Sequence, residues 1–364
     1  MIISNSLHPM KLITVAAVFL SMVSCSVYEA SNPSEHPSYL VITDYLSANT
    51  GADLSDQIQR VIDEHPNRTI YFPDGKYCIS KPILTPADPT RSVSLSLSNY
   101  AHIMPVDASK WKHDEAMIRL GGELPANKIA QAGSLYFLEG GIIDGLGVAK
   151  GVSIDSGRET MIRNTSIINT VVGIHIKFGA NYGSSDSDIQ NVNIDGNNQK
   201  DCIGVLVEGF DNTFTNMRIA KVHIGVLLRT GGNSLRNIHP LCSSSQEEYD
   251  SSCGFVDEGA DNFYSFCYSD QFATAFLNQG KHSTYSDCFC FWYSNRGEKH
   301  TVFHSTGAFN ATVTNLSVGM TKSNAAKQNV VLSVGKDGGK GKFVNLHITD
   351  ASVITDQAYK AYVL

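Results

Sequence analysis

G-V-S-I-D at residues 151–155 is the first of five segments that share one pattern. The others are G-I-H-I-K at 173–177, G-V-L-V-E at 204–208, G-V-L-L-R at 225–229 and G-F-V-D-E at 254–258. Their first residues lie 21 to 31 positions apart, and an earlier column of triplets ending in asparagine precedes the last four: Asn164, Asn191, Asn216 and Asn237. Short apolar strands with glycine at the corners and this period are typical of a solenoid. The repeats therefore predict an all-β parallel β-helix.

The composition supports stacked strands and excludes some functions. Only 17% of the 364 residues are charged, whereas 30 are glycine. A helical protein would carry more Glu, Lys and Leu. The net charge is −7 and no basic stripe is visible, so we expect no nucleic-acid partner.

The N-terminus has the features of an export signal. Met10-Lys11 begins a short polar region, and the apolar run at 12–23 is too short to span a membrane. The run ends in Met22-Val23-Ser24-Cys25, which resembles a bacterial lipobox. This predicts a lipoprotein anchored through lipidated Cys25, at the outer membrane or cell surface. The alternative is a plain secretory signal and a periplasmic or secreted protein.

We therefore expect three parts. Residues 1–25 form the signal peptide with its lipobox, 26–40 a flexible tether, and 41–364 one β-helix domain. Membrane contact is expected through the lipid anchor only.

A longer stretch near the start of this domain resembles a known family. TGADLSDQIQRVIDEHPNRTIYFPDGKYCISKPI, residues 50–83, is similar to the entry module of the pectate-lyase-like β-helix superfamily. The resemblance implies a right-handed parallel β-helix over roughly 42–350. On physical grounds, Ser55 can cap a helix whose apolar side is Ile58, Val61 and Ile62. Such a helix would cover the open end of the solenoid, where strand edges are otherwise unpaired.

Two columns of the repeat have expected structural roles. We expect the asparagine column to turn inward and hydrogen-bond from coil to coil. The residue that ends each glycine segment alternates in sign, which predicts an outward ladder of weak ion pairs: Asp155, Lys177, Glu208, Arg229 and Glu258.

The cysteines and carboxylates leave little room for a metal. No C-x-x-C spacing occurs, so zinc is not expected. Cys242 and Cys253 bracket an acidic insert and either form a disulfide or are both buried thiols. We expect Cys267 and Cys288 to stack in the interior. No cofactor is expected; calcium would need convergent oxygens, for which the pairs Asp186/Asp188 and Asp195/Asp201 are the candidates.

Extra residues at one corner locate the candidate site. The distance from the asparagine column to the glycine column is 9, 13, 9 and 17 residues, so inserts lie at 196–200 and 240–252. Inserts at one corner of a solenoid build a wall beside a binding face. Carboxylates, histidines and an aromatic ring gather there and in the coil that follows, which suits carbohydrate cleavage. The candidate site residues are Asp195, Lys200, Asp201, His223, Arg229, Asp270, Trp292, Arg296 and His300.

A second resemblance points to Asp201 and His223. Lys200-Asp201-Cys202-Ile203, followed by Val222-His223-Ile224-Gly225, faintly resembles the polygalacturonase strings D-D-C-I and G-H-G. It implies that Asp201 is a catalytic acid and His223 its neighbour. In hydrolysis, Asp195 or Asp270 would be the second carboxylate. The sequence departs from the pattern, because Lys200 replaces the first Asp and Val222 the first Gly.

Elimination is the other chemistry that these residues allow. A base removes the proton next to a uronate carboxylate, and a cation neutralises that carboxylate. The candidate substrate-binding residues are Lys200, Arg229, Arg296 and His300, with Trp292 stacking on a sugar ring. The predicted function is an exported polysaccharide-cleaving enzyme, a lyase or a glycoside hydrolase, acting on an acidic or plant-type glycan. The alternative is a non-catalytic glycan-binding or surface β-helix protein.

Overall fold

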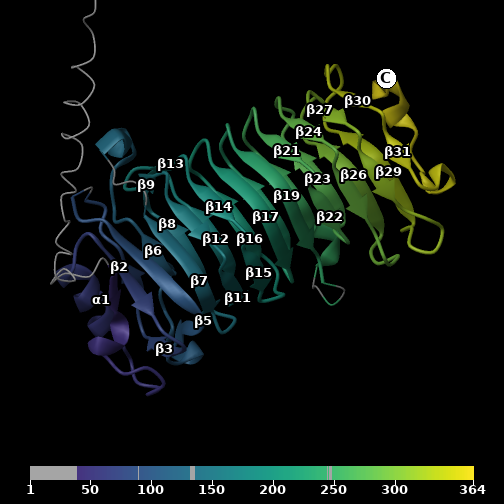
Figure 1. Ribbon diagram of the computed structural model, residues 1–364. Helices are drawn as coiled ribbons and strands as arrows, with labels where there is room; N and C mark the ends of the chain where they lie inside the picture. The colour runs from purple at the N-terminus through teal and green to yellow at the C-terminus, as the bar shows by residue number, and fades with distance from the viewer. Residues whose placement is uncertain (1–38, 89, 132–135, 244, 246–247) are drawn as a thin grey trace, which may run out of the picture. The chain divides into compact units, whose positions relative to one another are not determined.

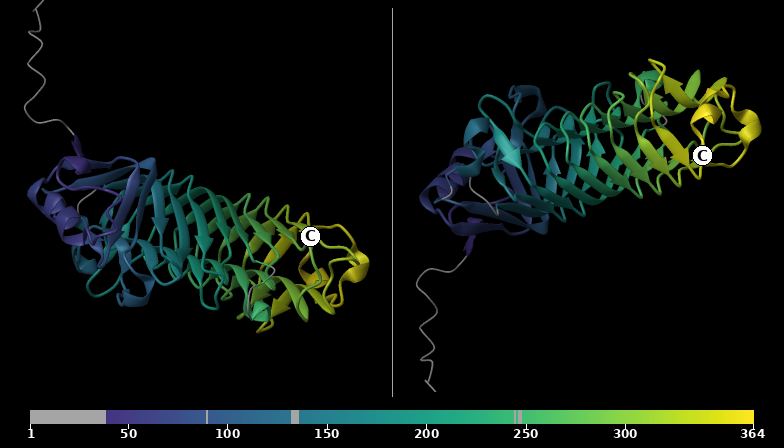
Figure 2. Two further views of the ribbon diagram at one scale, coloured as in Figure 1. Left: turned by 90° about the horizontal axis from the view of Figure 1, so that it is seen from below. Right: turned by 90° about the horizontal axis from the view of Figure 1, so that it is seen from above.

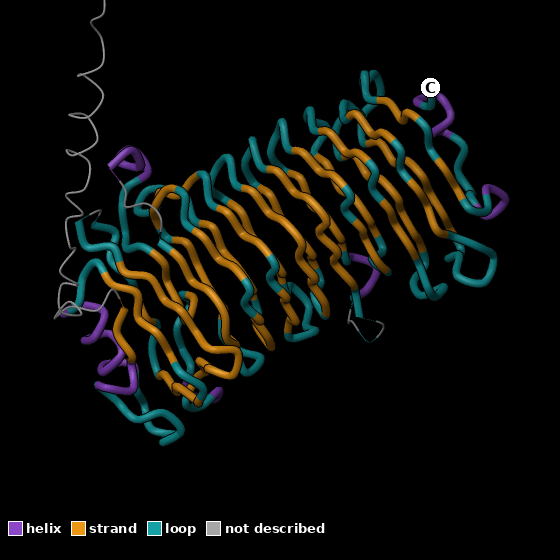
Figure 3. The backbone as a smooth tube through the Cα atoms, viewed as in Figure 1, coloured by secondary structure: helices purple, strands orange, loops and turns teal. Residues whose placement is uncertain are grey.

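The computed structural model describes residues 39–364 except 89, 132–135, 244 and 246–247. The predictions for the signal peptide, Cys25 and most of the tether fall outside these residues. The described chain winds through parallel strands that stack coil upon coil (Figures 1 and 3). Figure 2 shows the same stacking from two further sides. The predicted parallel β-helix is confirmed.

The five glycine segments lie side by side within one ten-stranded parallel sheet. Its register places each segment directly beside the next; Ile174, for example, pairs with Val205. In spatial order its strands are β4 (Ile83–Leu84), β6 (Ala116–Leu120), β8 (Lys150–Ile154), β12 (Val172–Ile176), β16 (Ile203–Val207), β18 (Ile224–Leu228), β20 (Cys253–Asp257), β23 (Thr274–Asn278), β26 (Lys299–Ser305) and β29 (Gln328–Val334).

The other strands run along two further sides of the coils. One side holds β1 (Tyr39–Val41), β2 (Arg68–Phe72), β10 (Met161–Arg163), β14 (Asp188–Gln190), β21 (Phe263–Ser265), β24 (Thr284–Ser286), β27 (Thr312–Thr314) and β30 (Lys342–Val344). The next side holds β3 (Gly75–Ile79), β11 (Ser166–Thr170), β15 (Asn193–Gly196), β22 (Tyr268–Asp270), β25 (Phe289–Phe291), β28 (Ser317–Gly319) and β31 (His347–Ile348). Four long strands take part in both: β5 (Val93–Pro105), β7 (Phe137–Asp144), β17 (Thr213–Ala220) and β19 (Ser234–Leu241). A separate pair is formed by β9 (Ser156–Arg158) and β13 (Gly183–Ser185).

Helices are few in the described part of the chain. The helix α1 (Ser55–Glu64) buries Ile58, Val61 and Ile62 in the core, as predicted. Its N-cap is Leu54 rather than Ser55, and Asp53 instead accepts hydrogen bonds from the backbone N–H and hydroxyl of Ser55. Short 3-10 helices occur at Ile42–Asp44, Ala108–Lys110, Ala126–Gln131, Tyr249–Ser251, Ala351–Val353 and Ala358–Tyr362. No helix of the described residues is long and apolar enough to cross a membrane.

The asparagine column stacks as predicted, but it faces outward. The four asparagines have φ of 54 to 55°, a left-handed conformation that Asn tolerates well. Asn191 donates to Asn164 at 3.3 Å, and Asn237 donates to Asn216 at 2.9 Å. Their left-handed turn points the side chains away from the core. An inner ladder exists elsewhere: the fully buried Asn212, Asn233 and Asn262 hydrogen-bond from coil to coil at 3.0 to 3.1 Å.

The described cysteines are all free thiols. Cys242 and Cys253 are both buried and form no disulfide. Cys267 and Cys288 are buried in the core, as predicted. No group of three or more His, Cys, Asp or Glu side chains within the described ranges is placed to hold a metal ion.

Candidate functional site

The insert corner forms a wall, as its spacing predicts. Asn198 donates to Ser245 at 2.9 Å, and exposed Lys200 pairs with Glu248 at 2.8 Å. Asp201 and His223 also lie here, but the backbone N–H of Asp201, not its carboxylate, donates to His223 Nδ1 at 3.1 Å. His223 is 4% exposed, and burial lowers its pKa.

The other predicted carboxylates lie on β15 and β22, on a different sheet. Asp195 pairs with Lys221 at 2.7 Å, whereas Asp270 lies 3.5 Å from His239. Asp195, Asp201 and Asp270 therefore contact different partners. The contacts in the structure do not join them into one acid–base constellation.

The predicted aromatic platform is inside the protein. Trp292 is 1% exposed and donates its indole N–H to the carbonyl of Phe272 at 2.7 Å. His300 is fully buried, its ring stacked against Trp292 at 5.1 Å, and burial lowers its pKa to about 4. Arg296 donates to Ser243 and lies over the ring of Tyr249. These residues hold the wall together rather than facing a substrate.

The outer face of the ten-stranded sheet offers a better site. Side chains in the middle of each strand point outward there, and they change from charged or polar to apolar along the sheet. Arg119, Ser153 and His175 come from β6, β8 and β12, and apolar residues follow at Leu206, Leu227, Val256 and Leu277. The first strands therefore bring charged and polar groups onto one face.

Four charged residues form a cluster at this end, which we call the carboxylate–cation cluster: Glu115, Arg119, Asp155 and Lys177. Arg119 donates to buried Asp155 at 2.7 Å through Nε, and Lys177 lies 3.4 Å from the same carboxylate. Lys177 also pairs with Glu115. The predicted charge ladder is therefore correct in pairing Asp155 with Lys177, but both residues are buried rather than exposed.

Next to this cluster, His175 pairs with Glu208. Nε2 of His175 lies 2.8 Å from Glu208 Oε2, and the hydrogen bond from His175 lowers the pKa of Glu208. With Glu208 ionised, Nε2 carries the ring proton and Nδ1 is left as the basic nitrogen. Arg229, about half exposed, bridges Glu208 at 2.7 Å and Glu258 at 3.7 Å, which matches the predicted ladder.

Two further side chains on this face can donate a proton or bind an anion. Tyr182 donates its hydroxyl to Glu115 at 3.2 Å, and burial, with the charge of Glu115, raises its pKa to about 12. Lys150 pairs at 2.8 Å with Asp114, whose side chain is 98% exposed. An ion pair with so exposed a carboxylate contributes little, so an incoming anion can replace it. The hydrogen bond and charge of Lys150 lower the pKa of Asp114.

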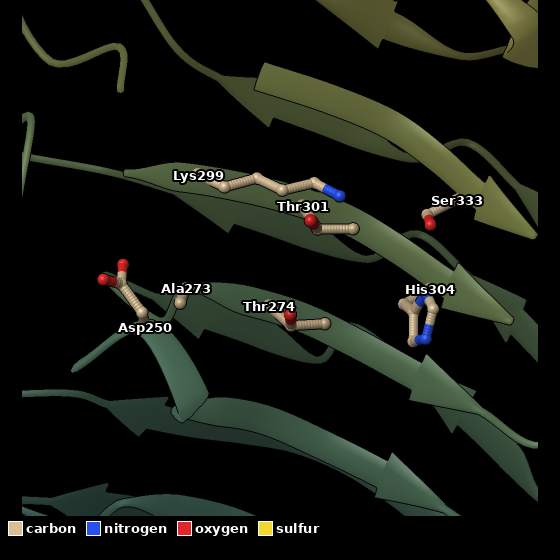
Figure 4. Close-up of a pocket in the computed structure, with 7 residues that line it drawn as sticks. All are labelled: Asp250, Ala273, Thr274, Lys299, Thr301, His304 and Ser333. Carbon is tan, nitrogen blue, oxygen red and sulfur yellow. The ribbon is translucent and has the colours of Figure 1, made fainter. Parts of the chain in front are cut away.

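A polar pocket lies at the other end of the same sheet. Figure 4 shows Lys299, Thr301 and His304 along β26, with Thr274 from β23 on one side and Ser333 from β29 on the other. Asp250 of the wall and Ala273 complete the lining. Burial lowers the pKa of His304. The outer face therefore carries polar groups at both ends and an apolar stretch between them.

The sequence contained only part of this site. His175 stands inside a glycine segment, where alternation within the strand predicts an outward side chain. Glu115, Arg119 and Tyr182 lie in coils or turns without the repeat, so no spacing linked them to it.

Comparisons with solved structures support the fold. An alginate lyase from Paenibacillus sp. aligns with a TM-score of 0.57 and 13% identity over 78% of this chain and 97% of its own. A family 28 exopolygalacturonase from Yersinia enterocolitica aligns with a TM-score of 0.56 and 10% identity over 86% of this chain and 70% of its own. The surface protein and adhesin PfbA of Streptococcus pneumoniae aligns with a TM-score of 0.54 and 12% identity over 85% of this chain and 95% of its own.

Sequence comparisons add no closer relative. No family model matches this sequence, and no curated protein matches it. The chain thus shares the right-handed parallel β-helix fold with enzymes and an adhesin alike.

Proposed function

We propose that this protein is an exported lyase that cleaves a uronate-containing polysaccharide by β-elimination. The site is the outer face of β8, β12 and β16. The single observation that carries the proposal is the His175–Glu208 pair, a base with its orienting carboxylate. The cation Lys150, paired with exposed Asp114, stands on the neighbouring strand β8, three residues before Ser153, the register partner of His175. A histidine held by a carboxylate is a common arrangement for a general base.

The residues fit the steps of the reaction. Lys150 exchanges Asp114 for the substrate carboxylate, which makes the neighbouring C–H more acidic. His175 Nδ1 takes that proton. The electron pair of the broken C–H bond then forms a C=C bond, and the glycosidic C–O bond breaks. Tyr182, whose pKa of about 12 keeps it protonated, gives its hydroxyl proton to the leaving oxygen. Solvent then reprotonates Tyr182 and takes the proton from His175.

Hydrolysis fits the site less well. It requires a carboxylic acid whose pKa is raised so that it can donate a proton. The pKa of Glu208 is lowered, chiefly by its hydrogen bond with His175. Burial is the largest single influence on Glu115 and opposes its ionisation, but the hydrogen bonds and charges of Lys177, Arg119 and Tyr182 together lower that pKa too. Burial does raise the pKa of Asp257, but that residue is sealed in the core.

A non-catalytic glycan-binding protein is the second candidate. The observation that favours it is the carboxylate–cation cluster, in which Arg119 and Lys177 are already paired with Asp155 and Glu115. Ions held in this way stabilise a fold without taking part in chemistry. The fold itself is compatible with both candidates.

The experiment uses alginate, polygalacturonate and a neutral glucan as substrates. Ultraviolet absorbance of the unsaturated uronate product is recorded beside the appearance of reducing ends. Elimination predicts that both signals rise together on an acidic polymer. His175→Gln should lower turnover about 100-fold or more, the usual contribution of a general base. His304→Gln, at the same outward position of β26, is the matched control and should stay within a few-fold of wild type. Unchanged turnover in His175→Gln would refute the proposed base.

A further inference from the structure

The outward asparagine ladder is interrupted at one coil by a phenylalanine. The ladder runs through Asn237, breaks at Phe266, and resumes where Asn315 donates to Asp287 at 2.8 Å. The backbone N–H of Phe266 makes the same bond to the next coil as the ladder residues do, reaching Ser286 O at 3.1 Å. Phe266 therefore occupies a ladder position without a ladder side chain.

This position is unfavourable for phenylalanine in two ways. Its φ is 54°, a left-handed conformation that suits Asn and Gly but strains a bulky side chain. The residue is also 55% exposed to solvent, so burial does not compensate. An asparagine here would relieve the strain and continue the ladder. The strain and the exposure together single out Phe266 as a candidate for a role other than stability.

Phe266 belongs to a group of outward rings, which we call the aromatic corner: Phe263, Phe266, Tyr268 and Phe289. Phe263 of β21 is 53% exposed and belongs to the same coil. Tyr268 of β22 stacks on His239 at 4.0 Å and contacts Phe289 of β25 at 4.8 Å. The corner thus joins two strands of one coil to the coil that follows, on sheets other than the one that carries the proposed active site.

The neighbours of these rings favour a polysaccharide as the partner. In the strand register, Phe263 lies between Ser234 and Thr284, and Ser265 lies between Arg236 and Ser286. Asn237 and Asp287 flank Phe266 in the ladder. Every one of these flanking side chains can hydrogen-bond and none is aliphatic. Ring faces set among hydroxyl, amide and charged groups match a sugar chain, which has apolar C–H faces and hydroxyl edges.

We propose that the aromatic corner is a second, non-catalytic polysaccharide-binding site. It holds a glycan chain by stacking sugar rings on Phe263 and Phe266, while the flanking polar groups bind hydroxyls. The positive Arg236 and the negative Asp287 balance, so the corner does not require an acidic sugar. This site is independent of the reaction proposed above.

The test is affinity electrophoresis of the purified protein through gels that contain alginate, polygalacturonate or laminarin. Three variants are compared: Phe266→Asn, Phe263→Thr and the double substitution. Phe266→Asn is the most informative variant, because it removes the ring and restores the asparagine ladder. Tyr100→Ser, at a 75% exposed ring far along the chain from the corner, is the matched control.

We expect at least one gel to retard the wild type, and the double variant to bind that polysaccharide at least tenfold more weakly. Phe266→Asn should bind more weakly while its melting temperature is unchanged or higher, which a purely structural role would not produce. Equal retardation of wild type and double variant would overturn the proposal, as would an equal loss in Tyr100→Ser. Loss of self-association or of vesicle binding in the double variant, without a change in gel retardation, would also overturn it. Cleavage is followed separately, so an inactive protein that still binds leaves this inference standing.

Discussion

Acidification should destabilise the protein through buried His300. The residue is fully buried, and its pKa is lowered from 6.5 to about 4, chiefly by burial. Nε2 lies 2.8 Å from the carbonyl of Arg296, which fits a proton on that nitrogen, and buried Nδ1 has no hydrogen-bond partner. A second proton would place a buried charge between Trp292 and Tyr249, which Asp250 offsets only in part.

The sign and the size follow from these two pKa values. Between pH 6.5 and 4 the unfolded chain takes up a proton that the folded chain refuses, so stability falls as pH falls through this window. A difference of about 2.5 units at about 1.36 kcal/mol each predicts a loss of about 3 kcal/mol from His300 alone.

The assay is urea unfolding of wild type and His300→Gln at pH 7 and at pH 4. Other groups titrate in both proteins, so the relevant quantity is the difference between them. Acidification should cost the wild type about 3 kcal/mol more than the variant. Exposed His347→Gln serves as the control and should follow the wild type. Identical pH dependence of wild type and His300→Gln would refute the reasoning.

Three further outcomes follow from the site and the N-terminus. Asp155→Asn leaves Arg119 and Lys177 without their shared carboxylate and should lower the free energy of unfolding by about 3–5 kcal/mol; a loss under about 1 kcal/mol would contradict the buried network. Lys150→Ala should raise KM for a polyuronate more than it lowers kcat, because Lys150 binds the substrate carboxylate; steady-state kinetics that show unchanged KM would exclude that role. Cys25→Ala should release the protein from membranes if Cys25 is lipidated, and unchanged partition in cell fractionation would reject the anchor.

The fold was predictable because the coils of a solenoid repeat the same residue types at matching positions, so the period appears in the sequence. Each coil must place glycine and a left-handed residue at the same points, so Gly204 and Gly225, or Asn216 and Asn237, recur in the sequence. Whether these side chains point inward or outward was harder to predict. The ladder asparagines point outward because of their left-handed turn, and no alternation of apolar residues reports that. The inner ladder at Asn212, Asn233 and Asn262 stands four residues before Asn216, Asn237 and Phe266, a constant offset in the sequence that would have predicted it.

The site was less predictable because it joins residues that no spacing connects. Asp201 stood out through a short similarity to another family, yet only its backbone reaches His223. Trp292 and His300 looked like groove residues because they follow an insert. However, His300 lies in β26, where residues 300–303 are all buried, which the alternation of a strand does not predict. Glu115 reaches Lys177 from a chain separation of 62 residues, which only the stacking of coils reveals.

The most direct test of the central claim is the mass of the products formed from a polyuronate. Elimination yields one product that is lighter by one water molecule than the corresponding hydrolysis product. Wild type should yield the lighter, unsaturated oligosaccharides, and His175→Gln should yield almost none while unfolding at a similar temperature. Products of full hydrolytic mass, or equal product from both proteins, would contradict elimination at the outer face of the ten-stranded sheet.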